Sequence, residues 1–293
     1  MRAAVIGTGR MGAAMAARLA ASGVEVTVYN RTRSRAEAVA AGIGATVAST
    51  AREAAASAPV VLVSLADDSA VGEAYPGPDG IAAGVSSGTV VCDTSTVDPE
   101  TARRTAALVR AAGGAALDTP VSGSVSTVES GSLAILVGGA SADLERARPV
   151  LDHIASRVFP LGPAGAGAAM KLAVNGVVHA INQAVSEALV VAESSGIART
   201  AAYDVLAAGA AGAPFVQYKR AAFEDPEGAP VAFTLELVAK DLDLLIALAD
   251  RVGVPVDQAR ANRAAAGDAV TDGMGAADMS AMAVHLRQRR GEG

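Results

Sequence analysis

Glycines with a regular spacing lie close to the start of the chain. Residues 7–12 read Gly-Thr-Gly-Arg-Met-Gly, directly after the apolar run at 3–6 and before an alanine-rich segment. This pattern between a strand and a helix is typical of a loop that binds a dinucleotide. Gly7 permits a tight turn, Gly9 lets the backbone approach a pyrophosphate, and Gly12 lets helix and strand pack closely. The N–H groups at the helix start would hold the phosphates.

The end of the second apolar run bears on which dinucleotide binds. NAD enzymes usually place Asp or Glu there to accept from the ribose 2′-hydroxyl. This run ends in Tyr-Asn-Arg-Thr at 29–32, and Arg31, Arg33 and Arg35 would offer charged donors to a 2′-phosphate. NADP is therefore favoured over NAD. The alternative for the later arginines is a solvated helix start.

Short β-branched runs alternate with alanine-rich segments through the first half of the chain. This rhythm predicts βαβ units and a mainly parallel sheet. The expected strands lie at 3–6, 24–29, 60–65, 89–93, 115–118, 133–138 and 157–161. We expect no strand after the last of these.

The second half has helical character throughout. Gly162 and Pro163 end the last strand, and the segment 166–196 predicts one helix of about eight turns that stops at Gly196. Apolar residues at three-and-four spacing predict another helix at 235–252. The expected fold is an α/β N-terminal Rossmann domain at 1–162 and an all-α C-terminal domain at 163–293, joined by the long interdomain helix. We expect residues 287–293 to form a frayed tail.

Composition excludes several classes of partner. The formal charge of −6 and the pI near 5.2 leave no basic field for a nucleic acid. Arg, Glu or Asp interrupt the apolar stretches before they reach the roughly 18 residues that a membrane helix needs. The single cysteine, Cys92, lies in an apolar run, which indicates a buried, unreactive thiol and a cytoplasmic protein.

Six motifs occur in an order that is more specific than any one of them. They are GTGRMG at 7–12, DTST at 93–96, DTPVSGS at 118–124, GSLAILVGG at 131–139, GAGAAMKLAVN at 165–175 and AKDLDL at 239–244. In this order they resemble the β-hydroxyacid dehydrogenase family along nearly the whole chain. That family includes 3-hydroxyisobutyrate dehydrogenases, tartronate semialdehyde reductases and glyoxylate/succinic semialdehyde reductases. Ser124 and the Asn-Arg-Thr stretch at 30–32 favour the last of these branches.

The resemblance implies that Lys171 is the catalytic acid/base and that Asn175 lies beside it. Residues four apart on a helix share one face, which is consistent with this pairing. Desolvation and a nearby positive nicotinamide would favour a neutral, titratable amine. The alternative is an ordinary surface lysine on an amphipathic helix.

The segment at 118–124 follows a predicted strand and should lie at the carboxyl edge of the sheet, where ligands bind. The resemblance implies that it anchors the acid group of the substrate. We expect this role for the hydroxyl of Ser122, the amide of Gly123 and also for Ser124.

The loop after the strand at 89–93 would approach the nicotinamide ribose and the substrate through Ser95 and Thr96, by the same resemblance. The alternative is a turn that caps the helix starting at Pro99. The full set of predicted cofactor contacts is Gly7, Gly9, Arg10, Met11, Gly12, Asn30, Arg31, Thr32, Leu65, Ala66, Thr96 and Lys240.

Further substrate contacts are expected in the helical half. The resemblance implies that Lys240 steers the substrate carboxylate, that Asp241 lies beside it, and that Phe233 lines the pocket. The alternative for Lys240 and Asp241 is an exposed ion pair.

Two other kinds of chemistry lack the residues they need. His153, His179 and His285 do not form a metal-binding set, so we expect no metal. Ser122 has no identifiable base partner, which argues against covalent acyl chemistry.

The dinucleotide motif predicts an NAD(P)-dependent oxidoreductase, with NADPH favoured, and the resemblance implies that it transfers hydride to or from a short carboxylated aldehyde or β-hydroxyacid. The rival enzyme class is an imine reductase, which typically lacks the lysine, and the rival outside enzymology is a non-catalytic NADP-binding scaffold. By analogy with the family we expect a homodimer or homotetramer formed through the helical half.

Overall fold

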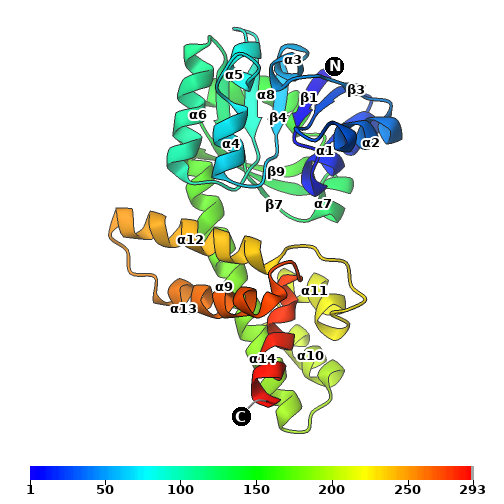
Figure 1. The fold of residues 1–293 in the computed structure, drawn as a ribbon, viewed down its shortest axis with the longest axis vertical. Helices are drawn as coiled ribbons and strands as arrows, with labels where there is room; N and C mark the ends of the chain where they lie inside the picture. Colours follow the sequence, from blue (N-terminus) through cyan, green and yellow to red (C-terminus); the bar gives the residue numbers. More distant parts are fainter. Residues whose placement is uncertain (292–293) are drawn as a thin grey trace. The chain divides into compact units, whose positions relative to one another are not determined.

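The computed structural model describes residues 1–291. By its internal contacts the chain divides into an α/β unit, Met1–Lys171, and a helical unit from Leu172 onward. Helix α9, Ala166–Ser194, runs through this division (Figure 1). The predicted fold class, a Rossmann-type domain followed by an all-helical domain on a long helix, is confirmed.

Within the described chain, nine strands form one sheet in the order β3-β2-β1-β4-β5-β6-β8-β7, with β9 beside β8. The strands are β1 (Arg2–Ile6), β2 (Glu25–Tyr29), β3 (Thr46–Val47), β4 (Val60–Val63), β5 (Val90–Asp93), β6 (Ala115–Asp118), β7 (Val121–Ser122), β8 (Leu133–Gly138) and β9 (Ala155–Gly162). Strands β1 to β6 pair in parallel, and β8 pairs antiparallel to β6 and β7.

All seven predicted strands are present, with shifts of one or two residues at their ends. The two strands that sequence patterns did not predict, β3 and β7, have two residues each. A strand this short shows no alternation of apolar and polar residues, so local patterning cannot reveal it.

Helices cover both faces of the sheet because side chains alternate along each strand. Ala3 and Val5 of β1 belong to one apolar core, and Ala4 and Ile6 belong to the other. Helices α1, α2, α7 and α8 pack on the first core, and α3, α4, α5 and α6 pack on the second (Figure 1). These helices are α1 (Arg10–Ala21), α2 (Arg33–Ile43), α3 (Ala51–Ala56), α4 (Asp68–Ala74), α5 (Ile81–Gly84), α6 (Pro99–Ala111), α7 (Val125–Glu129) and α8 (Ser141–Leu151).

The helical unit has its own apolar core, in which Tyr203, Phe223 and Leu242 are fully buried. Besides the rest of α9, its elements are α10 (Arg199–Ala208), α11 (Pro214–Glu224), α12 (Leu235–Val252), α13 (Asp257–Ala269), the π-helix η1 (Val270–Met274), the 3₁₀ helix η2 (Met279–Ala281) and α14 (Met282–Gly291). The predicted helices at 166–196 and 235–252 correspond to α9 and α12. Gly196 has a φ of 86°, the left-handed conformation that favours glycine after a helix.

The expected frayed tail is wrong for residues 287–291, which continue α14. Arg287 donates through Nε and Nη2 to the two carboxylate oxygens of Glu193 on α9, at 2.5 and 2.7 Å. This pair lowers the pKa of Glu193. This bidentate ion pair joins α14 to α9 at the first residue of the expected tail, a contact that composition could not reveal. The other two residues of the predicted tail lie outside the described residues.

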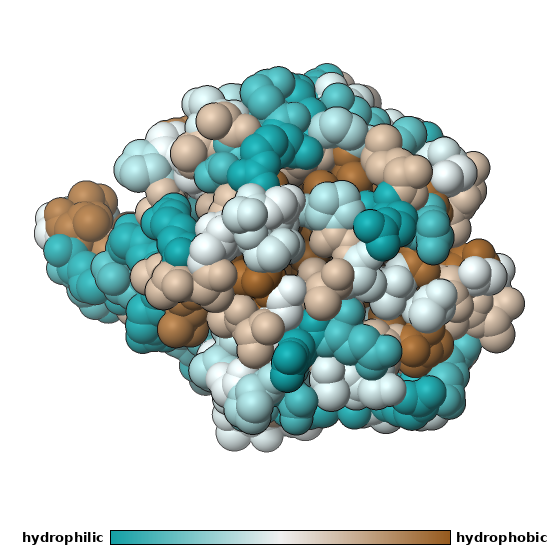
Figure 2. Space-filling view, turned by 90° about the horizontal axis from the view of Figure 1, so that it is seen from above, coloured by the Kyte–Doolittle hydropathy of each residue, from teal (hydrophilic) through white to brown (hydrophobic). Residues whose placement is uncertain are grey.

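Polar and apolar residues are interspersed on the surface. On the face shown in Figure 2, hydrophilic residues surround small hydrophobic patches. Across residues 1–291, no helix combines the length and hydropathy that crossing a membrane requires.

Candidate active site

The glycine-rich loop has the geometry that its spacing predicts. Gly7 follows β1 with a φ of 94°, and a Cβ at Gly12 would collide with the carbonyl oxygen of Gly7. A Cβ at Gly9 would meet open space within the described chain. Gly9 caps the start of α1 and has no side chain to occupy its first N–H groups. The residues therefore fit a dinucleotide pyrophosphate, with Arg10 exposed and Met11 half-buried beside it.

The end of β2 is joined to this loop by Asn30. Its Oδ1 accepts from the backbone N–H of Thr8 at 3.2 Å, and its Nδ2 donates to the carbonyl of Thr32 at 3.0 Å. Arg31 forms a surface ion pair with Glu73 at 2.9 Å, in which the two side chains are 83% and 62% exposed. Exposed ion pairs of this kind contribute little to the stability of a protein, so a phosphate could replace the carboxylate of Glu73 as the partner of Arg31.

A buried carboxylate, Asp93, organises the loops that follow β4 and β5. It accepts from the amide of Ser95 at 2.9 Å and from the hydroxyl of Tyr75 at 2.8 Å. The hydroxyl of Ser95 accepts in turn from the amide of Leu65 at 2.9 Å. Burial raises the pKa of Asp93, although these hydrogen bonds oppose the rise. Ser95 therefore joins the two predicted cofactor loops.

The neighbouring residues of these loops are more accessible. Thr96 is half-buried, Leu65 is half-buried and Ala66 is exposed. The helix after this loop, α6, is capped by Asp98, which accepts from the amide of Glu100 at 2.8 Å. Because Asp98 supplies the cap, Thr96 is not needed for it.

Asp118, the last residue of β6, holds the start of the long helix. Its Oδ1 accepts from the amide of Gly165 at 2.8 Å, and its Oδ2 accepts from the amide of Ala168 at 2.9 Å. These amides belong to the N-terminal end of α9, where a carboxylate is favourable both as a cap and against the helix dipole. Lys171 follows Ala168 by three residues and is half-buried. Asp118 thus sets where the helix that carries Lys171 begins.

The predicted carboxylate anchor, 122–124, lies between β7 and α7. Gly123 has a φ of 144°, and a Cβ there would lie 2.8 Å from Leu133 Cδ2. The amide of Ser124 donates to Thr127 Oγ1 at 2.8 Å, and its hydroxyl lies 2.8 Å from that of Ser126. Ser124 therefore shapes the turn, while Ser122 is half-buried and Gly123 is exposed.

The helical unit brings a second group of predicted residues together. Asn175 Nδ2 donates to Asp241 Oδ2 at 2.5 Å, and Lys240 Nζ lies 3.1 Å from Asp241 Oδ1. The carboxylate is buried, with 1% of its side chain exposed. Burial on its own would raise the pKa of Asp241, but His179 and Lys240 lower it below its ordinary value. Asp241 is therefore an ionised, buried acceptor rather than half of an exposed ion pair.

His179 and Phe233 complete this group. His179 Nε2 lies 3.7 Å from Asp241 Oδ2, and the imidazole lies against the ring of Phe233 with the centroids 5.7 Å apart. Asn175 and His179 are four residues apart on α9, and both are buried. From sequence alone, His179 is weighed only as a metal ligand. Its spacing of four residues from Asn175 could have predicted that the two side chains share a face of α9.

Phe233 is held by a buried ion pair that sequence patterns did not predict. Lys219 Nζ donates to both oxygens of Asp278, at 2.6 and 2.8 Å. Asp278 Oδ2 also accepts from the amides of Ala232 at 2.7 Å and Phe233 at 3.2 Å. These contacts join α11, the segment before α12 and η2, because the partners come from all three.

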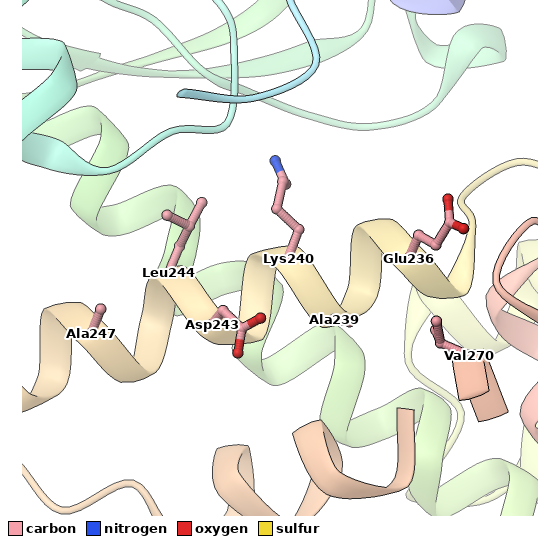
Figure 3. A pocket seen from close by; sticks show the side chains of 7 residues that line it. All are labelled: Glu236, Ala239, Lys240, Asp243, Leu244, Ala247 and Val270. Carbon is pink, nitrogen blue, oxygen red and sulfur yellow. The ribbon is translucent and has the colours of Figure 1, made fainter. Parts of the chain in front are cut away.

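An open groove of about 550 Å³ runs along α12 beside this group. It is lined by Glu236, Ala239, Lys240, Asp243, Leu244, Ala247 and Val270. In Figure 3 the side chains of Glu236, Lys240 and Leu244 project from the same side of α12. Its lining combines four apolar residues with the acidic Glu236 and Asp243, and Lys240 is its cationic group. Within the described residues, no three His, Cys, Asp or Glu side chains gather as a metal site would require.

The fold, the dinucleotide loop of the α/β unit and the polar group around Asp241 in the helical unit define a class of protein. This class is the nicotinamide-dependent oxidoreductases with a Rossmann-type domain and a helical domain. Residues 2–162 match the family described as the NAD binding domain of 6-phosphogluconate dehydrogenase. Residues 165–286 match the family described as NAD-binding of NADP-dependent 3-hydroxyisobutyrate dehydrogenase.

Individual relatives match over most of their length. The chain is 34% identical to glyoxylate/succinic semialdehyde reductase 1 of Arabidopsis thaliana, over 96% of this chain and 97% of the relative. It is 32% identical to an NAD-dependent L-serine dehydrogenase of Pseudomonas aeruginosa, over 82% and 83% of the two chains.

Among solved structures, the 3-hydroxyisobutyrate dehydrogenase of Mycobacterium tuberculosis with L-serine matches with a TM-score of 0.84 and 31% identity, over 98% and 99% of the chains. The chain belongs to the β-hydroxyacid dehydrogenase family, and it is an NAD(P)-dependent enzyme of that family.

Proposed function

We propose that the enzyme reduces a short carboxylated aldehyde to the corresponding hydroxyacid with NADPH, and that Lys171 is the general acid. The observation that carries this proposal is the placement of Lys171 and Asn175 one turn apart on α9, with Asn175 bound to the buried carboxylate of Asp241. We assign residues 1–162 to the cofactor domain and residues 163–293 to the substrate domain.

The chain's residues divide the work of the reaction. Bound NADPH would supply the hydride that reaches the carbonyl carbon. Lys171 gives its proton to the carbonyl oxygen as that oxygen becomes an alkoxide, and the reverse reaction returns the proton to the amine. Ser122 and the amide of Gly123 bind the substrate carboxylate, and Phe233 lines its apolar part.

The preference for NADPH rests on the end of β2. No acidic side chain follows Tyr29 to accept from a ribose 2′-hydroxyl, and Arg31 and Arg33 are exposed there. Arg31 and Thr32 would bind the 2′-phosphate, since a guanidinium offers paired donors to phosphate oxygens.

The first experiment compares initial rates for short semialdehydes, ketones and cyclic imines, with NADPH and NADH separately. We expect carboxylated aldehydes with NADPH to be turned over fastest. Turnover of imines and not of aldehydes would instead indicate an imine reductase. Tight binding of NADPH without turnover of any compound would indicate a non-catalytic scaffold.

The role of Lys171 is tested with Lys171→Ala. Loss of a general acid should lower kcat by about 10²- to 10⁴-fold. NADPH affinity, measured by nicotinamide fluorescence, should stay unchanged because Lys171 is not assigned to the cofactor. Equal activity of Lys171→Ala and the unmodified enzyme would refute the assignment.

Assembly and location follow from other features. Val177 and Val191 on α9 and Val205 on α10 are 61%, 66% and 74% exposed, which supports a homodimer or homotetramer formed through the helical unit. The single cysteine supports a cytoplasmic location. Light scattering of the purified protein measures the assembly.

A further inference from the structure

His179 is a buried titratable side chain to which the proposed reaction assigns no role. Only 4% of the residue is exposed, and neither ring nitrogen has a hydrogen-bond partner among the described residues. An imidazole buried in this way is costly unless it gains an interaction in return. The polar group that it faces is the carboxylate of Asp241, 3.7 Å from Nε2.

The orientation of Asn175 depends on the charge of that carboxylate. An ionised carboxylate only accepts hydrogen bonds, so Asn175 must turn its NH₂ group toward Asp241, as it does at 2.5 Å. The carbonyl oxygen of Asn175 is then left as the acceptor end of the amide. A protonated or displaced Asp241 would permit the opposite orientation, in which Asn175 presents a donor instead.

The two groups nearest to Asp241 that favour its ionised form are His179 and Lys240. Lys240 comes from α12, where its side chain is 22% exposed beside the open groove. His179 comes from α9, is buried, and is held in place by the ring of Phe233 at 5.7 Å. His179 is thus the rigid partner of the carboxylate, and Lys240 is the accessible one.

We propose that His179 is a positioning residue: its Nε2–H faces Asp241, keeps that carboxylate ionised and oriented, and thereby makes Asn175 present its carbonyl oxygen on the face of α9 that carries Lys171. An acceptor one turn from Lys171 can orient the ammonium from which the carbonyl oxygen takes its proton. This inference rests on the proposed function, since Lys171 is the acid there. It adds a residue that acts through Asp241 and Asn175 rather than by touching the substrate.

A second histidine provides a matched control. His285 on α14 is 1% exposed, its ring nitrogens likewise have no hydrogen-bond partner among the described residues, and its Nδ1 lies 3.4 Å from Asp272. Its acidic partner is 57% exposed, whereas Asp241 is 1% exposed. His285 therefore shares the burial of His179 but has no contact with Asp241 or Asn175.

The kinetic test compares His179→Phe, His179→Gln and His285→Phe. Phe keeps the ring contact with Phe233 and removes both nitrogens, while Gln restores an N–H donor. We expect His179→Phe to lower kcat by about 10- to 100-fold, the size that misplacement of a catalytic group produces. KM for the aldehyde should not change, His179→Gln should recover most of the lost kcat, and His285→Phe should have the kcat of the unmodified enzyme.

Two results would overturn the proposal. One is an unchanged kcat in His179→Phe, and the other is an equal loss of kcat in His179→Phe and His285→Phe, which would mean that burial is all that matters. An unmodified enzyme without turnover would instead contradict the proposed function.

The positioning role is then decided by nitrogen-15 NMR of the histidine rings without any ligand, in which three residues give three sets of signals. The proposal requires a protonated Nε2 in His179 and a shift of that signal in Asp241→Asn. No shift would refute it.

Discussion

The buried ionisable side chains of this protein differ in the charge that their surroundings permit. Asp278 and Asp241 have lowered pKa values, because basic partners outweigh the effect of burial. Cys92 has acidic neighbours instead. Burial, followed by the charges of Asp93 and Asp143, raises the pKa of its thiol to about 12. The direction of each pKa shift is set by the charged partners of the buried group. We therefore make a separate prediction for Cys92 and for Asp278.

We predict that Cys92 does not react with a thiol reagent in the folded protein at about pH 8, since the thiolate is the nucleophile. In urea, Cys92 should react at the rate at which the protein unfolds. The absorbance of the thiol that the reagent releases measures the rate of this reaction. Rapid reaction in the absence of urea would show that Cys92 becomes accessible without unfolding.

The ion pair between Lys219 and Asp278 should contribute to stability. Asp278→Asn leaves a buried ammonium without its counter-charge and should lower the free energy of unfolding by about 3 kcal/mol at neutral pH. The pKa of Asp278 is lowered in the folded protein, so this contribution is present above the unfolded pKa of about 4 and is lost as pH falls through the folded value.

Urea unfolding at neutral and progressively lower pH tests this expectation. The control is Glu73→Gln, which breaks an exposed pair with Arg31 and should cost below about 1 kcal/mol. A loss in Asp278→Asn no larger than in the control, or one that does not change with pH, would contradict the prediction.

At the scale of the elements, the start of α9 determines where Lys171 lies. The carboxylate of Asp118 binds two amides at the beginning of this helix, and Gly167 leaves no room for a larger residue, because a Cβ there would lie 2.8 Å from the carbonyl oxygen of Asp118. A strand end and a helix start are thus joined directly.

We predict that Asp118→Ala lowers the free energy of unfolding by about 1 to 2 kcal/mol, the range for loss of a helix cap. It should also lower kcat, because Lys171 lies in the turn that follows the cap. Asp98→Ala is the matched control, since it removes the cap of α6, which carries no assigned catalytic residue. Similar losses of stability with an unchanged kcat in both variants would show that the cap has no influence on Lys171.

At the scale of the whole molecule, ligand binding adds to stability in proportion to the logarithm of ligand concentration. NADPH at a hundred times its Kd should raise the free energy of unfolding by about 2.7 kcal/mol. At equal concentrations NADH should raise the melting temperature less.

Arg31→Ala should reduce the thermal shift with NADPH and leave that with NADH unchanged, because only NADPH carries the 2′-phosphate. Arg148→Ala, which removes a half-buried arginine of α8, is the control. Equal thermal shifts with the two cofactors in the unmodified protein would refute the preference for NADPH.

Local patterns in the sequence were sufficient to predict the alternating strands and helices, the turn at 7–12 and the long helix. Each depends on residues within a few positions of one another: the period of apolar residues, the conformations open to glycine, and the pitch of a helix. The common face of Lys171 and Asn175 follows in the same way from their spacing.

Tertiary structure decided which polar groups meet. Asn175 binds Asp241, which lies 66 positions away, and the amides of α9 bind Asp118 across 47 and 50 positions. Several carboxylates in the chain could serve any of these donors, and spacing does not choose among them. The choice is made when the cores pack, because a buried donor must find an acceptor within about 3 Å, and only the folded backbone places one there.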